Sequence, residues 1–219
     1  MIPSHKGYRL AWQGVDWILD PGRALFREDT KELLIADWHL GKALKLQESG
    51  VAMPEQATVD EFVRVTQLAE RYNAHRLVVL GDWIHARLED GAVLKDRLRR
   101  FVKDLRCPVL LLMGNHDRAW SALWRDVGVQ TEVSLISSSI CYMHGDRKMD
   151  TDLPSVMGHF HPGRRVKLGP RQSVLVRGFW LRSRAMILPA FGELTRMSHV
   201  EEPQDRFFAI LENQYVREV

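Results

Sequence analysis

Residues 77–117 read LVVLGDWIHARLEDGAVLKDRLRRFVKDLRCPVLLLMGNHD. The stretch contains two short apolar runs, residues 77–80 and 109–113, which are typical of buried strands. Between them, residues 93–105 have apolar side chains at helical spacing, and Pro108 separates this predicted helix from the second strand. A strand–helix–strand unit of this kind indicates parallel strands in an α/β fold.

The rest of the chain divides into an α/β part and a β-rich part. Before the quoted stretch, apolar patterns predict strands at residues 17–19, 24–26 and 33–36 and a helix at residues 55–72. After about residue 131, short β-type runs follow one another with little helix between them. They lie at residues 140–143, 155–157, 173–176, 185–188 and 207–211. We therefore expect an α/β fold with two mixed β-sheets packed together and helices outside, as a single domain over residues 1–219.

Composition is that of an ordinary globular protein, with 45% hydrophobic and 27% charged residues in 219. No apolar run approaches the roughly 18 residues of a membrane span, and the N-terminus lacks the apolar core of a signal peptide. We expect a cytoplasmic protein with no membrane partner. Cys107 and Cys141 lie in apolar runs without a CxxC pair, so buried free thiols are expected rather than a disulfide or a zinc site.

Positive charge is concentrated in the last third of the chain. Between His161 and Val200 there is one acidic residue, Glu193, against eight basic ones. These are Arg164, Arg165, Lys167, Arg171, Arg177, Arg182, Arg184 and Arg196. Such a stretch attracts phosphate-rich polymers without reading their base sequence, although a solvated strand face has the same composition.

Polar residues of metal-ligand type follow five of the predicted strands. They occur as Asp37-Trp38-His39, Gly81-Asp82, Gly114-Asn115-His116-Asp117, His144, and Gly158-His159-Phe160-His161. Residues i and i+2 of an extended chain point to the same side, so the first and last of these motifs can each present two ligands together. In α/β sheets, ligands collect beyond the carboxyl ends of strands. The five strand ends therefore predict one shared polar site.

The donor set indicates divalent metal ions. Carboxylate, amide oxygen and imidazole without thiolate suit Mn, Fe or Zn. Seven such residues are too many for one tetrahedral site and suit two ions bridged by a shared carboxylate. Each residue alone has an ordinary structural interpretation, because an Asp after a strand is commonly a turn former and a lone His commonly a packed side chain. The ordered set favours the metals.

That order of motifs resembles the calcineurin-like metallophosphoesterase superfamily from Asp37 to His161. The resemblance implies a four-layer α-β-β-α sandwich and hydrolysis of phosphoesters by metal-activated hydroxide. The ligands it implies are Asp37, His39 and His161 for one ion, Asn115, His144 and His159 for the other, and Asp82 as the bridge. His116 is then expected near the scissile phosphate as a catalytic residue that protonates the leaving group or stabilises its charge.

One position departs from the superfamily pattern. Many of its phosphatases read G-D-x-x-D-R, where the second Asp partners the histidine of G-N-H. This sequence has His85 at that place, and Arg87 lies one position beyond the usual arginine. The pattern G-D-x-x-H resembles the corresponding motif of DNA-repair nucleases in the superfamily. His85 is therefore a second catalytic candidate and Arg87 a substrate-binding one, while simple packing of His85 beside Trp83 is the alternative.

A narrower resemblance covers nearly the whole chain. Residues 37–43, 50–54 and 188–192 read DWHLGKA, GVAMP and LPAFG and are similar to the bacterial PdeM family of ligase-associated DNA damage response endonucleases or phosphoesterases. The resemblance implies Mn-supported phosphodiester cleavage with DNA as substrate, and a DNA ligase, a helicase and an exonuclease as partners. Lys42 either contacts a substrate phosphate or is a solvated helix residue. Trp38 and Trp83 either stack on a base or wall the site off from water.

Two other functions fit the same motifs. The first is a phosphatase or cyclic-nucleotide phosphodiesterase that acts on small molecules. The second is a non-catalytic scaffold, which the complete set of ligand positions disfavours. The sequence leaves the oligomeric state open, and exposed strand edges would permit a homo-oligomer.

Overall fold

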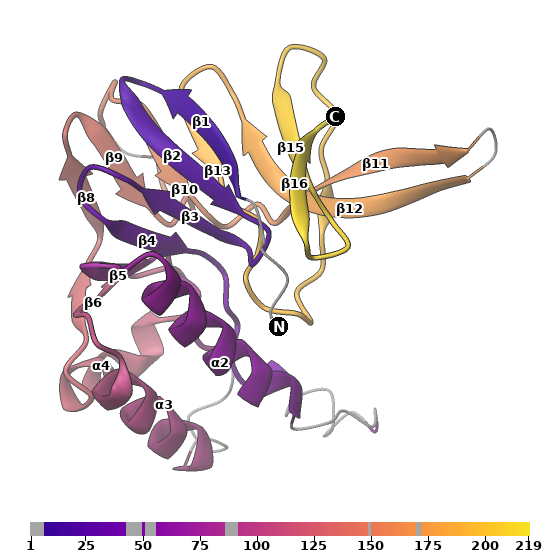
Figure 1. Cartoon of the computed structure of the whole chain (residues 1–219). Helices are drawn as coiled ribbons and strands as arrows, with labels where there is room; N and C mark the ends of the chain where they lie inside the picture. The colour runs from indigo at the N-terminus through magenta and orange to yellow at the C-terminus, as the bar shows by residue number, and fades with distance from the viewer. Residues whose placement is uncertain (1–6, 43–49, 51–55, 86–91, 149, 170–171) are drawn as a thin grey trace.

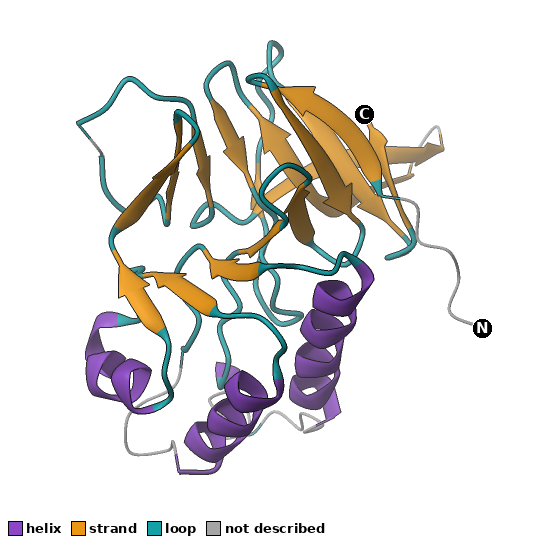
Figure 2. Cartoon of the chain, turned by 60° about the vertical axis from the view of Figure 1, so that its left-hand side comes forward, coloured by secondary structure: helices purple, strands orange, loops and turns teal. Residues whose placement is uncertain are grey.

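The computed structural model describes residues 7–42, 50, 56–85, 92–148, 150–169 and 172–219. Two β-sheets pack face to face, and the helices cover the outer face of the first (Figures 1 and 2). Both predicted sheets are therefore present, and both mix parallel with antiparallel pairing. Cys107 and Cys141 are buried free thiols, as expected.

The first sheet has seven strands in chain order. They are β1 (Tyr8–Trp12), β2 (Val15–Asp20), β3 (Ala24–Arg27), β4 (Glu32–Ile35), β5 (Arg76–Val79), β6 (Val109–Leu112) and β7 (Gln130–Glu132). Neighbours from β1 to β4 pair antiparallel, because turns connect them. Neighbours from β4 to β7 pair parallel, because helices connect β4 to β5, β5 to β6 and β6 to β7.

The helices are α2 (Gln56–Arg71), α3 (Ala92–Asp104), the 3₁₀ turn η2 (Arg118–Trp120) and α4 (Ser121–Asp126). Each presents an apolar stripe to the sheet, for example Val65 and Leu68 of α2 and Leu98 of α3. These side chains are buried with Leu77 and Val79, the residues of β5 that point outward. Alternate residues of β5 point to the other side, so the strand is apolar on both faces, as its continuous apolar run predicted.

The second sheet runs in the order β14-β11-β12-β13-β10-β9-β8, and β15 and β16 extend it from β12. Its strands are β8 (Ser134–Ser137), β9 (Ile140–Met143), β10 (Ser155–Met157), β11 (Pro162–Gly169), β12 (Gln172–Leu181), β13 (Ala185–Ile187), β14 (Ser198–His199), β15 (Arg206–Leu211) and β16 (Tyr215–Glu218). Strands β9, β10 and β13 are parallel. Side chains from both sheets fill the space between them, including Leu34, Val78, Tyr142, Val156 and Met186.

The outer face of the second sheet differs from the expected fourth layer. In the described part of the chain it carries no helix. A small apolar cluster that includes Trp180 and Phe207 lies there, and Val166 and Val176 of the β11–β12 hairpin pack against it. Strand β12 is long enough to belong both to the sheet and to this hairpin. The two-sheet sandwich is confirmed, with the helices on one side of it.

Candidate metal centre

The loops that follow β4 and β5 continue to pair beyond the strands. The backbone N–H of Asp37 donates to the Gly81 carbonyl at 3.1 Å, and the N–H of His39 donates to the Asp82 carbonyl at 2.9 Å. The N–H of His85 then donates to the Leu40 carbonyl at 2.8 Å. The two loops therefore hold their ligand-type residues at one end of the sandwich, beside the ends of β9 and β10.

The backbone at the site is strained. Five of the residues have positive φ: Asp37 at 52°, His39 at 55°, Asp82 at 50°, His159 at 69° and His161 at 46°. Non-glycine residues seldom adopt this left-handed conformation, and each instance costs about 1–3 kcal/mol unless the surroundings enforce it. A set of five in one place indicates that their side chains must point to a common target.

Asp37, His39 and His161 form the first ligand group, with ligand atoms within 4.8 Å of one another. His161 Nε2 lies 3.2 Å from Asp37 Oδ1 and 3.3 Å from His39 Nε2. Two atoms that bind one ion at about 2.0–2.2 Å, with angles of 90–110°, are themselves about 2.8–3.6 Å apart. Asp37 Oδ1 is buried without a hydrogen-bond partner among the described residues. The group therefore fits a divalent cation.

Asp82, His144 and His159 form the second group, again within 4.8 Å. His144 Nε2 lies 3.4 Å from Asp82 Oδ2 and 3.1 Å from His159 Nδ1. These are also the separations of atoms that share an ion. His144 Nδ1 lies 2.9 Å from the Leu80 carbonyl, so the ring donates from Nδ1 and keeps Nε2 for coordination.

The two groups are neighbours. Asp37 Oδ1 of the first lies 3.8 Å from His144 Nδ1 of the second, and Asp37 Oδ2 accepts a hydrogen bond of 2.8 Å from the backbone N–H of His159. Burial lowers the pKa of His39 in the first group, and the charge of Asp82 in the second group opposes this shift. The two ligand groups therefore lie side by side.

Burial and charge set the protonation of the site. Burial lowers the pKa of His39 to about 3, so this ring is neutral, as a ligand must be. Burial would also lower the pKa of His144, but the hydrogen bond to Asp82 and the charge of Asp37 raise it to about 9. Burial alone would raise the pKa of Asp82; the hydrogen bond from His144 outweighs it and keeps the carboxylate ionised. An ion bound here would displace the proton of His144.

Glycines allow the close packing of the ligands. A Cβ at Gly81, where φ is +75°, would collide with the imidazole of His144. A Cβ at Gly158 would lie 2.6 Å from Asp37 Oδ2, and one at Gly114 would collide with the Asp82 carboxylate. In three of the five ligand motifs, the glycine before the polar residues is thus required sterically.

Asn115 and His116 lie at the rim, after β6. Both are exposed, and the backbone N–H of His116 donates to Asp82 Oδ1 at 3.0 Å. His116 Nε2 lies 3.8 Å from Asp82 Oδ2. The His85 ring lies 4.4 Å from the His116 ring and 5.0 Å from that of His39. His85 therefore stands at the site, next to His116, and not merely beside Trp83.

Lys42 and Arg87 are the two candidate contacts to a substrate phosphate. Lys42 follows the first motif, its backbone N–H donates to the His39 carbonyl at 3.2 Å, and its charge lowers the pKa of His39. It therefore lies near the first group. Arg87 lies outside the described residues.

Asp117 positions two loops of the site, a role that the sequence motifs did not predict. It is fully buried, and its carboxylate accepts hydrogen bonds from the backbone N–H groups of Asp82, Trp83 and Gly114 at 2.7–2.9 Å. Burial raises its pKa to about 6. Asp117 thus ties the loops after β5 and β6 together behind the ligands. Its place as the fourth residue of G-N-H-D was the available signal.

The tryptophans next to the ligands are wall residues. Trp38 and Trp83 are 1% and 0% exposed and stack on each other at 5.7 Å, and Trp124 stacks on Trp83 at 5.2 Å. Neither reaches a base. Phe160, between His159 and His161, is instead the exposed aromatic side chain of the site, at 41%.

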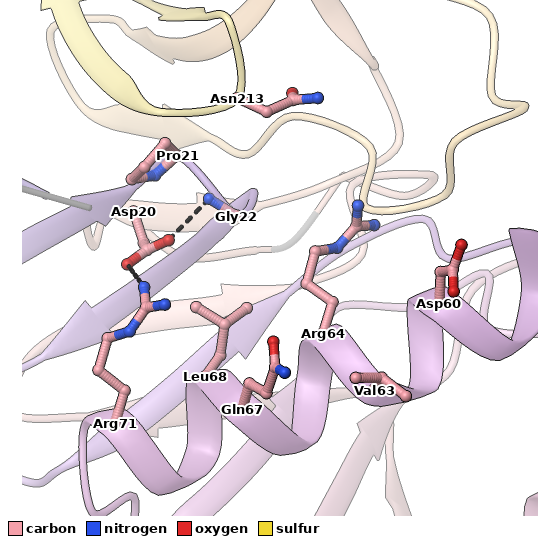
Figure 3. Close-up of a pocket in the computed structure, with 10 residues that line it drawn as sticks. All are labelled: Asp20, Pro21, Gly22, Asp60, Val63, Arg64, Gln67, Leu68, Arg71 and Asn213. Atoms are coloured by element: carbon pink, nitrogen blue, oxygen red, sulfur yellow. Dashed lines mark hydrogen bonds and ion pairs between the residues drawn. The ribbon is translucent and has the colours of Figure 1, made fainter. Parts of the chain in front are cut away.

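A separate cavity of about 350 Å³ lies between α2, the β2–β3 turn and Asn213 (Figure 3). Asp20 anchors its wall by accepting hydrogen bonds from the backbone of Gly22 and from Arg71 (Figure 3). Arg64, also on the wall, donates to Glu193 in the loop that adjoins Trp38. None of the residues that line this cavity is a candidate ligand, so the cavity lies outside the candidate metal centre.

The fold and the two ligand groups define a metal-dependent phosphoesterase. The model of the calcineurin-like phosphoesterase family matches residues 31–182, which is more than half of the chain. The chain therefore belongs to this family, whose members use divalent metal ions to hydrolyse phosphoesters.

Comparison with the solved structure of a nuclease agrees on the fold. The chain is similar to the nuclease MPE of Pseudomonas putida, with a TM-score of 0.83, 22% identity, and coverage of 97% of this chain and 100% of that one. It matches YfcE, a phosphoesterase of E. coli, with a TM-score of 0.41, 14% identity, and coverage of 86% and 97%. Curated protein sequences give no significant match. Among the described residues, no helix is long and apolar enough to cross a bilayer.

Proposed function

We propose that this phosphoesterase is a two-metal phosphodiesterase that cleaves DNA. The observation that carries the proposal is the pair of adjacent ligand groups, each with the separations of atoms around one ion. The proposed ligands are Asp37, His39, Asp82, Asn115, His144, His159 and His161. Mn is the metal we favour from the resemblance to PdeM, and Fe or Zn fit the same donors.

Ions bound there would supply a hydroxide at neutral pH and neutralise the phosphoryl oxygens. Side chains of the protein would position the groups and supply the proton. Asp117 holds the loops that carry Asp82 and His116, so their side chains keep a fixed separation. His116, at the exposed rim, is positioned to give a proton to the departing oxygen. His85 beside it adds a second imidazole at the leaving-group side.

The preference for a polynucleotide rests in part on His85. A carboxylate at that position would repel the backbone phosphates that flank the scissile one, whereas an imidazole does not. The basic stretch from Arg164 to Arg196 supports a polyanionic substrate. The P. putida neighbour is named a nuclease. By the resemblance to PdeM we also propose a cytoplasmic repair context with a DNA ligase, a helicase and an exonuclease as partners.

The test is a substrate panel with the Mn-loaded protein. It contains p-nitrophenyl phosphate, bis-p-nitrophenyl phosphate, a 2′,3′-cyclic nucleotide, and single- and double-stranded DNA. We expect cleavage of the diester and of DNA, and a loss of about 10²–10⁴-fold in His116→Ala, the usual contribution of a general acid. The variant also excludes a contaminating nuclease.

Three outcomes separate the alternatives. Intact DNA and unreacted diester with fully metallated protein would refute the proposal. A strong preference for the monoester or the cyclic nucleotide would select the small-molecule enzyme instead. If Asp82→Ala kept all biological activity, the scaffold function would be correct. As a reciprocal check, His85→Asp should weaken cleavage of DNA more than cleavage of bis-p-nitrophenyl phosphate, because only DNA brings flanking phosphates to the new carboxylate.

A further inference from the structure

The hairpin of β11 and β12 projects from the body of the molecule (Figure 1). It begins directly after the metal centre, because Pro162, the first residue of β11, follows His161. The residues that form or contact the candidate metal centre precede the hairpin in the chain or belong to the loop after β13. The catalytic site therefore gives the hairpin no role, although the hairpin carries much of the basic stretch.

The pairing register assigns each residue of the hairpin to one of two faces. Arg164 pairs with Val176 and Val166 with Val174, and paired residues of antiparallel strands lie on the same face. Val166 and Val176 pack against the apolar cluster on the second sheet. The guanidinium of Arg164 lies 5.0 Å from the Phe207 ring centre. Around Arg164, Val166 and Val176, this inner face thus packs on the second sheet.

The other face, which we call the outward face, carries Arg177, Arg165 and Lys167. Their partners in the register are Gly163, Leu175 and Ser173. Arg165 and Lys167 are exposed, and neither forms an ion pair with another described residue. Glu193, the one acid of the basic stretch, is engaged elsewhere, by Arg23 and Arg64. At Arg165 and Lys167 the outward face therefore presents positive charge without an acidic partner among the described residues.

The row of cations starts beside the metal centre. Arg177 Nη1 donates to the Gly192 carbonyl at 3.2 Å, in the loop that packs against Trp38. Arg165 and Lys167 lie four and six residues beyond His161. Since an extended chain spans at most about 3.6 Å per residue, they are within about 14 Å and 22 Å of that ligand. A polymer cleaved at the metals can reach both, whereas a small diester cannot.

We propose that the outward face of the hairpin is the track for the phosphodiester backbone of a nucleic acid strand that extends from the metal centre. The inference rests on the proposed phosphodiesterase function and adds the residues that discriminate a polynucleotide from a small diester. Arg165 and Lys167 contact backbone phosphates and read no base. Strand alternation places them about 7 Å apart on one side, so two separate phosphates are engaged.

The test removes both charges and compares polymer with small diester. The variant is Arg165→Gln/Lys167→Gln. The matched control, Lys103→Gln/Arg125→Gln, loses the same charge from exposed positions of α3 and α4. Binding of a fluorescent DNA oligonucleotide is measured over a salt series, and hydrolysis of bis-p-nitrophenyl phosphate and the melting temperature are measured in parallel.

The hairpin variant should bind DNA more weakly. On single strands, the slope of log K against log salt concentration should be smaller by about 1.4, because each lost phosphate contact removes about 0.7. Its hydrolysis of the small diester and its melting temperature should equal those of the wild type. An unchanged salt slope, or a slope that falls equally in the control, overturns the track. Failure of the wild type to cleave the small diester would instead refute the phosphodiesterase function itself.

Discussion

Replacing Gly81 by alanine should expel His144 from the second ligand group, and the chain offers a matched control. Gly81 and Gly128 both have φ of +75°, so alanine suffers the same backbone strain at each, about 1–2 kcal/mol. They differ in their surroundings. A Cβ at Gly81 meets three atoms of the His144 side chain closer than packing allows, whereas a Cβ at Gly128 has no atom within 4 Å.

The difference between the two variants therefore isolates the collision with His144. Forcing a buried ring aside costs about 1–3 kcal/mol, and the loss of its hydrogen bond to the Leu80 carbonyl costs about 1 kcal/mol. Gly81→Ala should thus be less stable than Gly128→Ala by about 3 kcal/mol, which corresponds to a difference in melting temperature of roughly 6–12 °C for a chain of this size.

The functional consequence is the loss of one ion. Metal analysis after dialysis against Mn should give two ions per chain for wild type and Gly128→Ala and one for Gly81→Ala, because the three atoms nearest the added methyl group all belong to His144. Hydrolysis of bis-p-nitrophenyl phosphate should fall with the second ion. If both variants melt within 2 °C of each other, or if Gly81→Ala retains two ions and full activity, our account of the packing is wrong.

Two further predictions concern stability. Removing the metals with EDTA should lower the melting temperature by about 10–20 °C, because an ion present at 100 times its dissociation constant contributes about 2.7 kcal/mol per site. Calorimetry measures this change, and the melting temperature of Asp82→Ala should respond to EDTA much less. Burial raises the pKa of Glu193, but Arg23 and Arg64 outweigh it and lower the pKa to about 2. The stabilisation by Glu193 is therefore complete above pH 4.5 and lost as the pH falls toward 2. Urea denaturation should show the advantage of wild type over Glu193→Gln shrinking between these values, and a constant difference would contradict the assignment.

Most strands and helices that are apolar or regularly amphipathic were predicted within a residue or two, but β12 extends to Leu181, five residues beyond the predicted end at residue 176. Strand β10, Ser155–Met157, and strand β9, Ile140–Met143, have the predicted bounds, and α2 and α3 begin and end within one residue of them. Most of the missed elements have no such pattern, although β1, Tyr8–Trp12, alternates exposed and buried residues from Arg9 to Trp12 and was also missed. Strand β7 is short and polar, and β11 is rich in arginine, so pairing with neighbours rather than side-chain periodicity makes them strands.

The sequence by itself determined the chemistry of the site. Asp, Asn and His directly after apolar runs must lie at strand ends, since the period of a strand and its burial fix where it stops and which side chains emerge. That reasoning collected the ligand residues, and the resemblance to the metallophosphoesterase superfamily divided them into two groups, before any distance was known. The metal roles and the single domain stay predictions, but the residues of each group do lie together.

Tertiary structure decided what local pattern cannot encode. Asp117 became a tie between two loops because its buried carboxylate meets N–H groups from residues 35 positions away. Trp38 and Trp83 became wall residues because the helices cover them, although both stand next to ligands in the chain. The helices cover one sheet only among the described residues, and the basic stretch became a projecting hairpin. Each of these features depends on contacts between segments that are distant in sequence. Such contacts produce no periodic pattern of residue types, so the sequence alone does not reveal them.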